Sequence, residues 1–492
     1  MFKQLKKLGR HSVVYGIGDL LGRVAAFLLL PVYTRYLAPE QYGALELLYM
    51  TSSVLSVFLG RQLSHATLRF YFEYDSEAER RLVISSSFVL YCAVVGPIIF
   101  LLCFFSKYLS IGLFSSNRYS LHFIVLLVTL FFGLSKEILL SYIRAIEKAV
   151  LFVELSVFSL VAKLSLSIYL VVVLDWAVLG VLMGNLIAES LTWLVLAGFT
   201  VRKCGIRVDS SKFKEMLWYC IPLIAVGISG TIIGSLGRFF LNFFLGLGAV
   251  GIYSLGVRIS SVFRFLAVEP FTKGYGPFRF AISRQEDAKE IYSRVTTYFT
   301  LICVWVCLAI LGLSREALQI MAKKEYWEAF NLLPILLLST LFGSGLYYMF
   351  QLGIYLQKST RILSVIFGLA AILDIILMWI MVPTWGVYGA SVAQCITHAF
   401  VSGITLVFAQ RAFFVPYEWN RLVKIGFTGI FIGCFVFFRW AESPYVSATL
   451  KLGALCGFPV LLFLVRFFSE AEVDRIKNFT REIRVRLGAA IS

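Results

Sequence analysis

The stretch that decides the fold runs from Tyr15 to Leu47 and reads YGIGDLLGRVAAFLLLPVYTRYLAPEQYGALEL. Its apolar run predicts a membrane-spanning helix, and a short turn containing Pro and Gly then leads into a second span. Asp19 and Arg23 interrupt the first span with four-residue spacing, so both lie on one helical face with the acid first, the favourable order for a pair. Charges at that depth are costly unless they face the bundle interior or a wet cavity. Both are therefore candidate functional residues.

The composition is that of a polytopic membrane protein. The 492 residues are 59% hydrophobic and only 15% charged, with a mean hydropathy of +0.85, whereas a soluble domain needs far more polar surface. The net charge of +17 would suggest nucleic acid in a soluble protein, but here a bias of Lys and Arg toward one set of loops explains it, and no nucleic-acid partner is expected. The nine cysteines are scattered, so neither a disulfide framework nor a metal site is predicted. The basic start MFKQLKKLGR lacks a following cleavage site and predicts an uncleaved signal anchor.

Hydropathy predicts an all-α protein with about 14 transmembrane helices. Apolar windows of about 20 residues, enough to cross about 30 Å of hydrocarbon, recur along the whole chain. Short connections separate them, and the longest are basic segments near 64–82, 202–215 and 270–290. The predicted spans are 12–35, 42–63, 83–105, 119–142, 150–173, 177–201, 216–243, 248–269, 291–313, 328–351, 362–383, 386–410, 422–440 and 446–466.

The distribution of Lys and Arg predicts the orientation. With the N-terminus in the cytoplasm, 32 of the 45 Lys and Arg residues fall in cytoplasmic segments, 8 in external segments and 5 within spans. Cytoplasmic loops carry the excess of positive charge in membrane proteins. We therefore predict a multi-pass protein of the cytoplasmic (inner) membrane, with both termini in the cytoplasm.

An internal repeat divides the chain. Residues 36–43 align with 244–251 at an offset of 208, and the Trp-x-x-x-Gly segment at 176–180 aligns with 385–389 at an offset of 209. Lys148 matches Lys358 at an offset of 210. Three matches at nearly constant spacing indicate a repeat of six spans. Because six is even, the two copies should be related by a pseudo-twofold axis along the membrane normal, with a cavity between two six-helix lobes.

The repeat predicts four parts of the chain. The N-terminal lobe (1–214) holds spans 1–6, and the C-terminal lobe (215–415) holds spans 7–12. Two extra helices follow at 416–468. The tail at 469–492 reads as a basic amphipathic helix on the anionic inner surface, with a partner-docking helix as the alternative.

Three stretches rich in Gly, Pro and aromatic residues carry a family resemblance. They are LLLPVYTRYLAPEQYGALEL at 28–47, SLGRFFLNFFLGLGAVGIYSLGVRI at 235–259 and GVYGASVA at 386–393. With them, nearly the whole chain resembles the oligosaccharide (O-antigen) flippases of the polysaccharide transporter family. Its superfamily also holds multidrug exporters and the peptidoglycan-precursor flippase. Where the family usually has Asp-Arg, this chain has Gly237-Arg238, so a role of that carboxylate does not carry over.

The resemblance implies a transporter that turns lipid-linked glycan precursors, on a polyprenyl pyrophosphate, from the inner to the outer leaflet. Its implied partners are this substrate, membrane lipids, and glycan polymerases or glycosyltransferases. The alternatives are a cation-coupled exporter of drugs and small amphiphiles, and a non-transporting scaffold of a glycan-assembly complex. The extra helices at 416–468 and the intramembrane cations favour the flippase. The sequence holds no motif of an enzyme, and no cofactor is expected apart from coupling to H⁺ or Na⁺.

Cations inside the spans are candidates for holding the phosphates, because Arg offers a planar fork and Lys a point charge. Five cations and six acids fall within predicted spans, so the count alone does not make a cavity positive. Each cation also has a structural reading, either as part of an ion pair inside a lobe or as an anchor at the headgroup level. The candidate cavity cations are Arg23, Lys163, Arg238 and Arg258.

Buried acids are candidates for coupling transport to an ion gradient, since a carboxylate with a raised pKa can take up H⁺ or Na⁺. An offset of 209 relates Glu189 to His398, so both lobes carry a titratable group at one depth. At an offset of 208, Asp19 and Arg23 correspond to glycine and threonine, which makes their site specific to one lobe. The candidate coupling residues are Asp19, Glu189, Asp374 and His398.

Overall fold

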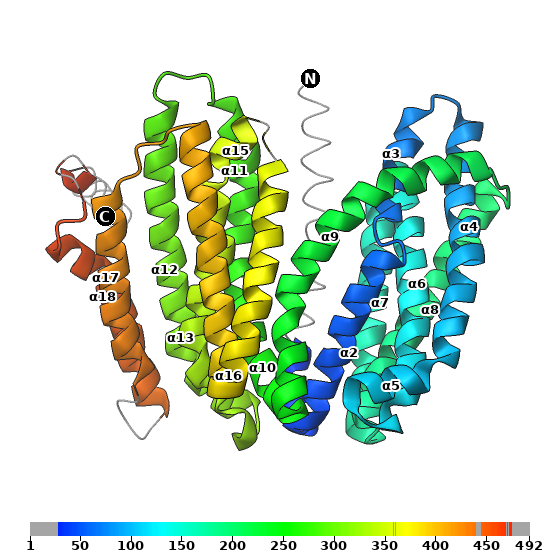
Figure 1. Cartoon of the computed structure of the whole chain (residues 1–492), viewed down its shortest axis with the longest axis horizontal. Coiled ribbons are helices and arrows are strands. Elements are labelled where there is room, and N and C mark those ends of the chain that lie inside the picture. Colours follow the sequence, from blue (N-terminus) through cyan, green and yellow to red (C-terminus); the bar gives the residue numbers. More distant parts are fainter. Residues whose placement is uncertain are drawn as a thin grey trace, which may run out of the picture. The chain divides into compact units, whose positions relative to one another are not determined.

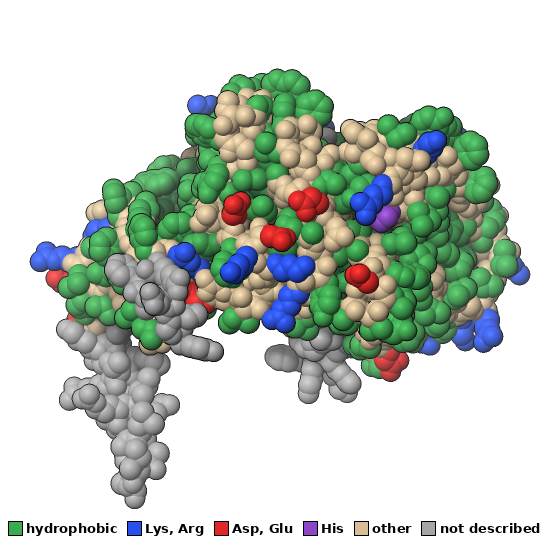
Figure 2. Space-filling view, turned by 90° about the horizontal axis from the view of Figure 1, so that it is seen from below, with side chains coloured by type: hydrophobic (Ala, Val, Ile, Leu, Met, Phe, Trp, Pro, Cys, Tyr) green, Lys and Arg blue, Asp and Glu red, His purple; other side chains and the backbone are tan. Residues whose placement is uncertain are grey.

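The computed structural model describes residues 28–357, 359, 361–438, 444–468, 470 and 472–474. These residues are helical almost throughout, with no strand among them (Figure 1). Ten helices in this part are long and apolar enough to cross a membrane, and two shorter apolar helices cover Ile233–Leu245 and Thr449–Leu464. On the face shown in Figure 2, hydrophobic side chains cover much of the surface. The predicted all-α polytopic class is confirmed.

The described helices differ from the predicted spans mainly by short additional helices. The predicted span 12–35 lies mostly outside the described residues. The segment α16 (Arg361–Ala412) breaks at Gly386, with φ 59° and ψ −133°, so it consists of two helices that correspond to the predicted spans 362–383 and 386–410. Helices α3 (Leu63–Glu73), α5 (Ser106–Phe114) and α11 (Glu269–Ala281) occupy segments predicted as connections. A window of about 20 residues misses them because they are only 11, 9 and 13 residues long.

The chain forms two compact units. Unit 1 comprises the described residues up to 254 together with 321–326 and 371–390, and unit 2 comprises the others. The first helices of unit 1 are α2 (Pro39–Phe58), α3, α4 (Glu77–Phe104), α5 (Ser106–Phe114), α6 (Ser120–Ala145), α7 (Ala149–Ile168), α8 (Ala177–Cys204) and α9 (Ser210–Leu245). Helix α10 (Leu247–Phe263) begins in unit 1 and ends in unit 2. The helices of unit 2 include α12 (Ala288–Met321), α13 (Ala329–Thr340), α14 (Tyr347–Phe350), α15 (Leu352–Leu356), α17 (Trp419–Phe437) and α18 (Pro444–Leu464).

Helix α6 is the centre of the packing in unit 1. It packs against α4 and α8, and α8 in turn packs against α7, so these helices stand side by side (Figure 1). One buried apolar cluster joins α3, α4, α6 and α9 through residues such as Leu63, Tyr91 and Leu127. A second joins α4, α6, α7 and α8 around Leu139 and Leu196. The bundle therefore holds α6 and α8 in fixed register, and these two helices supply both carboxylates of the cavity described below.

The repeat predicted at an offset of 208 has a direct counterpart within unit 1. A methyl group on Gly43 would lie 2.0 Å from the carbonyl oxygen of Leu247, and one on Gly251 would lie 2.1 Å from that of Pro39. The offset carries Pro39 to Leu247 and Gly43 to Gly251, so each contact is the copy of the other. Reciprocal contacts of this kind are what a twofold axis produces. The backbones of α2 and α10 thus meet at equivalent positions.

The repeat at an offset of 209 is visible in the backbone of two turns. Ala177 has φ 44° and its equivalent Gly386 has φ 59°, both in the left-handed region. In each copy, the glycine three residues later packs against backbone atoms. A methyl group on Gly180 would lie 3.0 Å from the carbonyl carbon of Leu170. A methyl group on Gly389 would lie 1.9 Å from the carbonyl oxygen of Met381. The two copies therefore make one type of turn, with glycine at its first position only in the second.

We expect Ala177→Gly to stabilise the protein by about 1 kcal/mol, because a left-handed conformation costs an L-residue about that much and glycine almost nothing. Gly386→Ala, the matched change in the other copy, should destabilise it by a similar amount. Denaturant titration of the purified protein in detergent micelles measures both. If both variants change the free energy of unfolding in the same direction, backbone strain does not distinguish the two turns.

Candidate functional site

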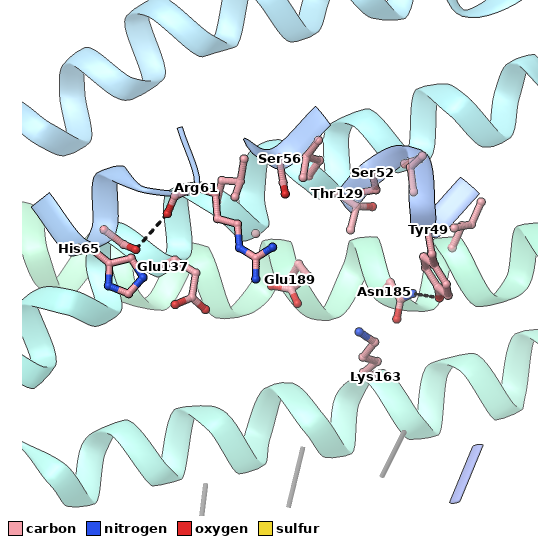
Figure 3. A pocket seen from close by; sticks show the side chains of 16 residues that line it. Tyr49, Ser52, Ser56, Arg61, His65, Thr129, Glu137, Lys163, Asn185 and Glu189 are labelled. Carbon is pink, nitrogen blue, oxygen red and sulfur yellow. Dashed lines mark hydrogen bonds between the residues drawn. The ribbon is translucent and has the colours of Figure 1, made fainter. Parts of the chain in front are cut away.

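Unit 1 contains a polar cavity of about 450 Å³, a volume typical of small-molecule sites. Its walls come from α2, the link between α2 and α3, and helices α3, α6, α7 and α8. Figure 3 shows the polar side chains that converge on it, with cations and carboxylates interspersed. These residues are Tyr49, Ser52, Ser56, Arg61, His65, Thr129, Glu137, Lys163, Asn185 and Glu189.

A break in one membrane helix supplies part of this wall. Helix α2 ends at Phe58 and α3 begins at Leu63, although both belong to one stretch of 35 residues that is apolar enough to span the membrane. Gly60, with φ 93°, makes the turn between them and brings Arg61 onto the cavity. Irregular backbone at membrane depth is tolerated where it is buried in protein or lines a wet cavity. Broken helices are also where transporters place their binding sites.

One carboxylate of the cavity is neutralised by a lysine of the helix bundle. The ammonium nitrogen of Lys136 on α6 lies 2.5 Å from Oε2 of Glu189 on α8, and both side chains are mostly buried. In Figure 3, Arg61 points into the space between Glu137 and Glu189. Neither Arg61 nor Glu137 makes a side-chain hydrogen bond or ion pair with the described residues. Their charges are therefore directed at the cavity.

The other end of the cavity is lined by uncharged hydrogen-bonding groups and one lysine. The amide nitrogen of Asn185 donates to the hydroxyl of Tyr49 at 2.7 Å. The Asn185 side chain is buried, and its carbonyl oxygen accepts no hydrogen bond within the described part of the chain. Lys163 on α7 points toward Asn185 (Figure 3). A ligand that reaches this end would find a hydrogen-bond acceptor without a partner among the described residues, beside a cation.

The predicted site residues fall into four groups. Lys163 and Glu189 line this one cavity. Arg238 and Asp374 lie elsewhere in unit 1, on α9 and α16, and both are buried. Arg258 and His398 belong to unit 2. Asp19 and Arg23 lie outside the described residues.

Arg238 is held in a buried polar cluster. Its Nε donates to the hydroxyl of Ser254 at 2.8 Å and its Nη1 to the carbonyl of Gly234 at 3.2 Å. Its Nη2 lies 3.6 Å from a carboxylate oxygen of Glu46, and its guanidinium faces the Tyr253 ring at 6.0 Å. Asp374 is fully buried and acts electrostatically on the same tyrosine. The cluster ties α2, α9, α10 and α16 together.

His398 in unit 2 makes a local bond. Its Nδ1 lies 2.8 Å from the hydroxyl and 3.1 Å from the carbonyl oxygen of Ser339 on α13. Glu189, its equivalent at an offset of 209, pairs with Lys136 of α6. The two copies therefore share a polar contact between corresponding helices, ionic in unit 1 and neutral in unit 2.

Sequence reasoning missed several cavity residues, namely Tyr49, Arg61, His65 and Asn185. Arg61 lies near the cytoplasmic end of the predicted span 42–63 and was not among the candidate cavity cations. Its signal in the sequence is Gly60-Arg61 followed by an amphipathic segment, which is helical at Leu63–Glu73. Asn185 and Tyr49 carry no charge and give no signal in a search for intramembrane ions.

The fold and the cavity define a class, a multi-pass helical membrane protein built like a transporter. Comparison with known proteins agrees. Residues 8–273, more than half of the chain, match the family described as polysaccharide biosynthesis protein. The chain belongs to this family, and the resemblance predicted from the sequence is confirmed.

Individual relatives show the same relationship. The chain is 25% identical to protein 1 of the Lsg locus of Haemophilus influenzae over 281 residues, which cover 57% of this chain and 68% of the relative. Among solved structures, the lipid II flippase MurJ in an inward closed conformation is similar with a TM-score of 0.71 and 14% identity, covering 93% of this chain and 99% of that chain. An inward-facing multidrug resistance MATE family transporter of the MOP superfamily has a TM-score of 0.61 and 17% identity, covering 85% and 99%. The chain therefore shares its fold with a lipid flippase and a multidrug transporter.

Proposed function

We propose that the protein is a flippase that moves lipid-linked oligosaccharide or polysaccharide precursors across the cytoplasmic membrane by alternating access. The supporting observation is a cavity lined by charged and hydroxyl side chains, within the membrane-spanning helices of a member of the polysaccharide biosynthesis family. A glycan headgroup cannot cross hydrocarbon unless its hydroxyl groups keep hydrogen-bonding partners. The cavity supplies such partners along the wall of a helical bundle.

The second candidate is an exporter of small amphiphiles, favoured by the likeness to the multidrug transporter. Sites for such ligands are lined mainly by apolar and aromatic side chains with few polar groups. Ten of the residues around this cavity are polar or charged and labelled in Figure 3. That lining fits a glycan better than an amphiphilic drug.

The proposal extends to residues whose roles are untested. We propose that the substrate phosphates are held by cations among Arg23, Lys163, Arg238 and Arg258, and that H⁺ or Na⁺ coupling uses Asp19, Glu189, Asp374 or His398. We further propose a polyprenyl pyrophosphate carrier, cytoplasmic termini, two lobes at 1–214 and 215–415, and glycosyltransferase or polymerase partners. Each of these rests on the sequence pattern and on the family.

Deletion of the gene in its own host tests the function. We expect surface glycan to fall to background while lipid-linked intermediates accumulate in the inner leaflet, and the intact gene should restore both. Surface glycan is measured by immunoblotting and the intermediates by mass spectrometry of extracted lipids. Normal surface glycan together with new drug sensitivity would replace the flippase with the exporter. Normal glycan without drug sensitivity would contradict both.

A further inference from the structure

The cavity of unit 1 has a chemical bias that a phosphate-binding site would not have. We infer that it holds the sugar residues of the substrate and not its diphosphate, an inference that rests on the proposed function and takes Lys163 out of the set of cations proposed to hold the phosphates. Three properties of the lining support this assignment: its carboxylates, its excess of hydrogen-bond acceptors, and the way its cations are distributed.

Two carboxylates, Glu137 and Glu189, line the cavity. A phosphate at about 4 Å from an ionised carboxylate is repelled by about 4 kcal/mol at an effective dielectric constant near 20. Lys136 offsets the charge of Glu189 at 2.5 Å, but Glu137 has no ion-pair partner in the part of the chain that the structure describes. A diphosphate near Glu137 would therefore meet a carboxylate that competes with it for Arg61, the cation that points between Glu137 and Glu189 (Figure 3).

The uncharged groups of the lining also present acceptors. Thr129 donates its hydroxyl hydrogen to the carbonyl of Val125 at 2.6 Å, and Ser56 donates to that of Ser53 at 2.7 Å, so both hydroxyls have only lone pairs left to offer. The buried carbonyl oxygen of Asn185 is an acceptor as well. A sugar hydroxyl donates and accepts, whereas an ionised phosphate only accepts. This lining matches the hydroxyl groups.

The cations occupy separate parts of the cavity and do not form one cluster. Arg61 points between the two carboxylates, while Lys163 lies at the other end beside Asn185 (Figure 3). Donors and acceptors thus alternate along the wall. A ring that carries several hydroxyl groups can satisfy such an alternation, whereas a compact diphosphate needs its donors gathered at one point.

Binding measurements on the purified full-length protein in detergent test the inference. The probes are a panel of neutral saccharides (glucose, galactose, N-acetylglucosamine and its disaccharide) and inorganic pyrophosphate, each titrated by isothermal calorimetry. We expect at least one saccharide to bind. Glu137→Gln should weaken it about tenfold, because the variant replaces a charge-assisted hydrogen bond with a neutral one. Pyrophosphate should show no measurable binding to the intact protein.

Glu79→Gln is the matched control, because Glu79 lies outside the cavity and pairs with Lys212 at 3.4 Å on the surface. It should leave every titration unchanged. Pyrophosphate binding to the intact protein that tightens in Glu137→Gln, with no saccharide bound, would overturn the inference. That result would leave the flippase standing if deletion abolishes surface glycan. Intact surface glycan after deletion would instead remove the flippase itself.

Discussion

Replacing Gly43 with alanine is expected to destabilise the protein by about 3 kcal/mol, at the upper end of the usual cost of overpacking. The added methyl group would lie 2.0 Å from the carbonyl oxygen of Leu247 and 2.9 Å from the amide nitrogen of Gly251. Both neighbours are backbone atoms of α10, so no side-chain rotation relieves the clash. The helices must move apart. Denaturant titration in detergent micelles, with chromatographic profiles of the folded fraction, measures the loss.

The reciprocal contact makes the prediction more specific. Gly251→Ala should cost about as much as Gly43→Ala, because its methyl group would lie 2.1 Å from the carbonyl oxygen of Pro39. The double variant should cost less than the sum, since one separation of the helices relieves both clashes and neighbouring sites are not additive. The control is Gly198→Ala, where a methyl group meets nothing within 4 Å and alanine favours the helix. A tolerated Gly43→Ala would mean that the crossing of α2 and α10 is not tight.

Hydropathy and the repeat predicted the fold class because both depend on patterns local to the sequence. The pairing of Gly43 with Gly251 follows the predicted offset, and two helices that cross at a pseudo-axis must meet at equivalent residues. The break between the predicted spans 362–383 and 386–410 lies at Gly386, as the sequence predicted, but a glycine alone does not fix the angle between the two helices. Spans are visible in a window of residues, whereas the angles between them depend on distant packing.

The sequence predicted only those residues of the candidate site that are charged and lie near the middle of a predicted span. Lys163 and Glu189 were singled out as intramembrane ions, and they line one cavity. Lys136 lies against Glu189 because α6 and α8 pack closely. Tyr49 and Asn185 are separated by 136 residues and bond across the bundle. No periodicity in either segment indicates that contact.

The second large effect is expected at a buried ion pair in unit 2. Lys451 lies in α18 with no exposed surface, and its ammonium nitrogen is 2.7 Å from Oε1 of Glu316 on α12. The hydroxyl of Ser447 donates to the same oxygen at 3.1 Å. Lys451→Met should destabilise the protein by about 3–5 kcal/mol, because it leaves the carboxylate of Glu316 buried without its counter-charge. Denaturant titration in micelles measures this loss.

The double variant Glu316→Leu, Lys451→Met distinguishes the cost of leaving one buried charge unpaired from the contribution of the ion pair itself. Buried ion pairs are often replaced by apolar side chains at little cost, because the desolvation of two charges disappears together with their attraction. We therefore expect the double variant to recover most of the stability lost in Lys451→Met. The control is Arg81→Ala, which breaks the exposed pair with Glu77 and should cost under about 1 kcal/mol. If the double variant is as unstable as Lys451→Met, contacts of the Lys451 side chain other than its ion pair stabilise the packing of α18 on α12. If the double variant folds yet lacks transport, the pair instead serves the substrate, and the two extra helices belong to the transport machinery.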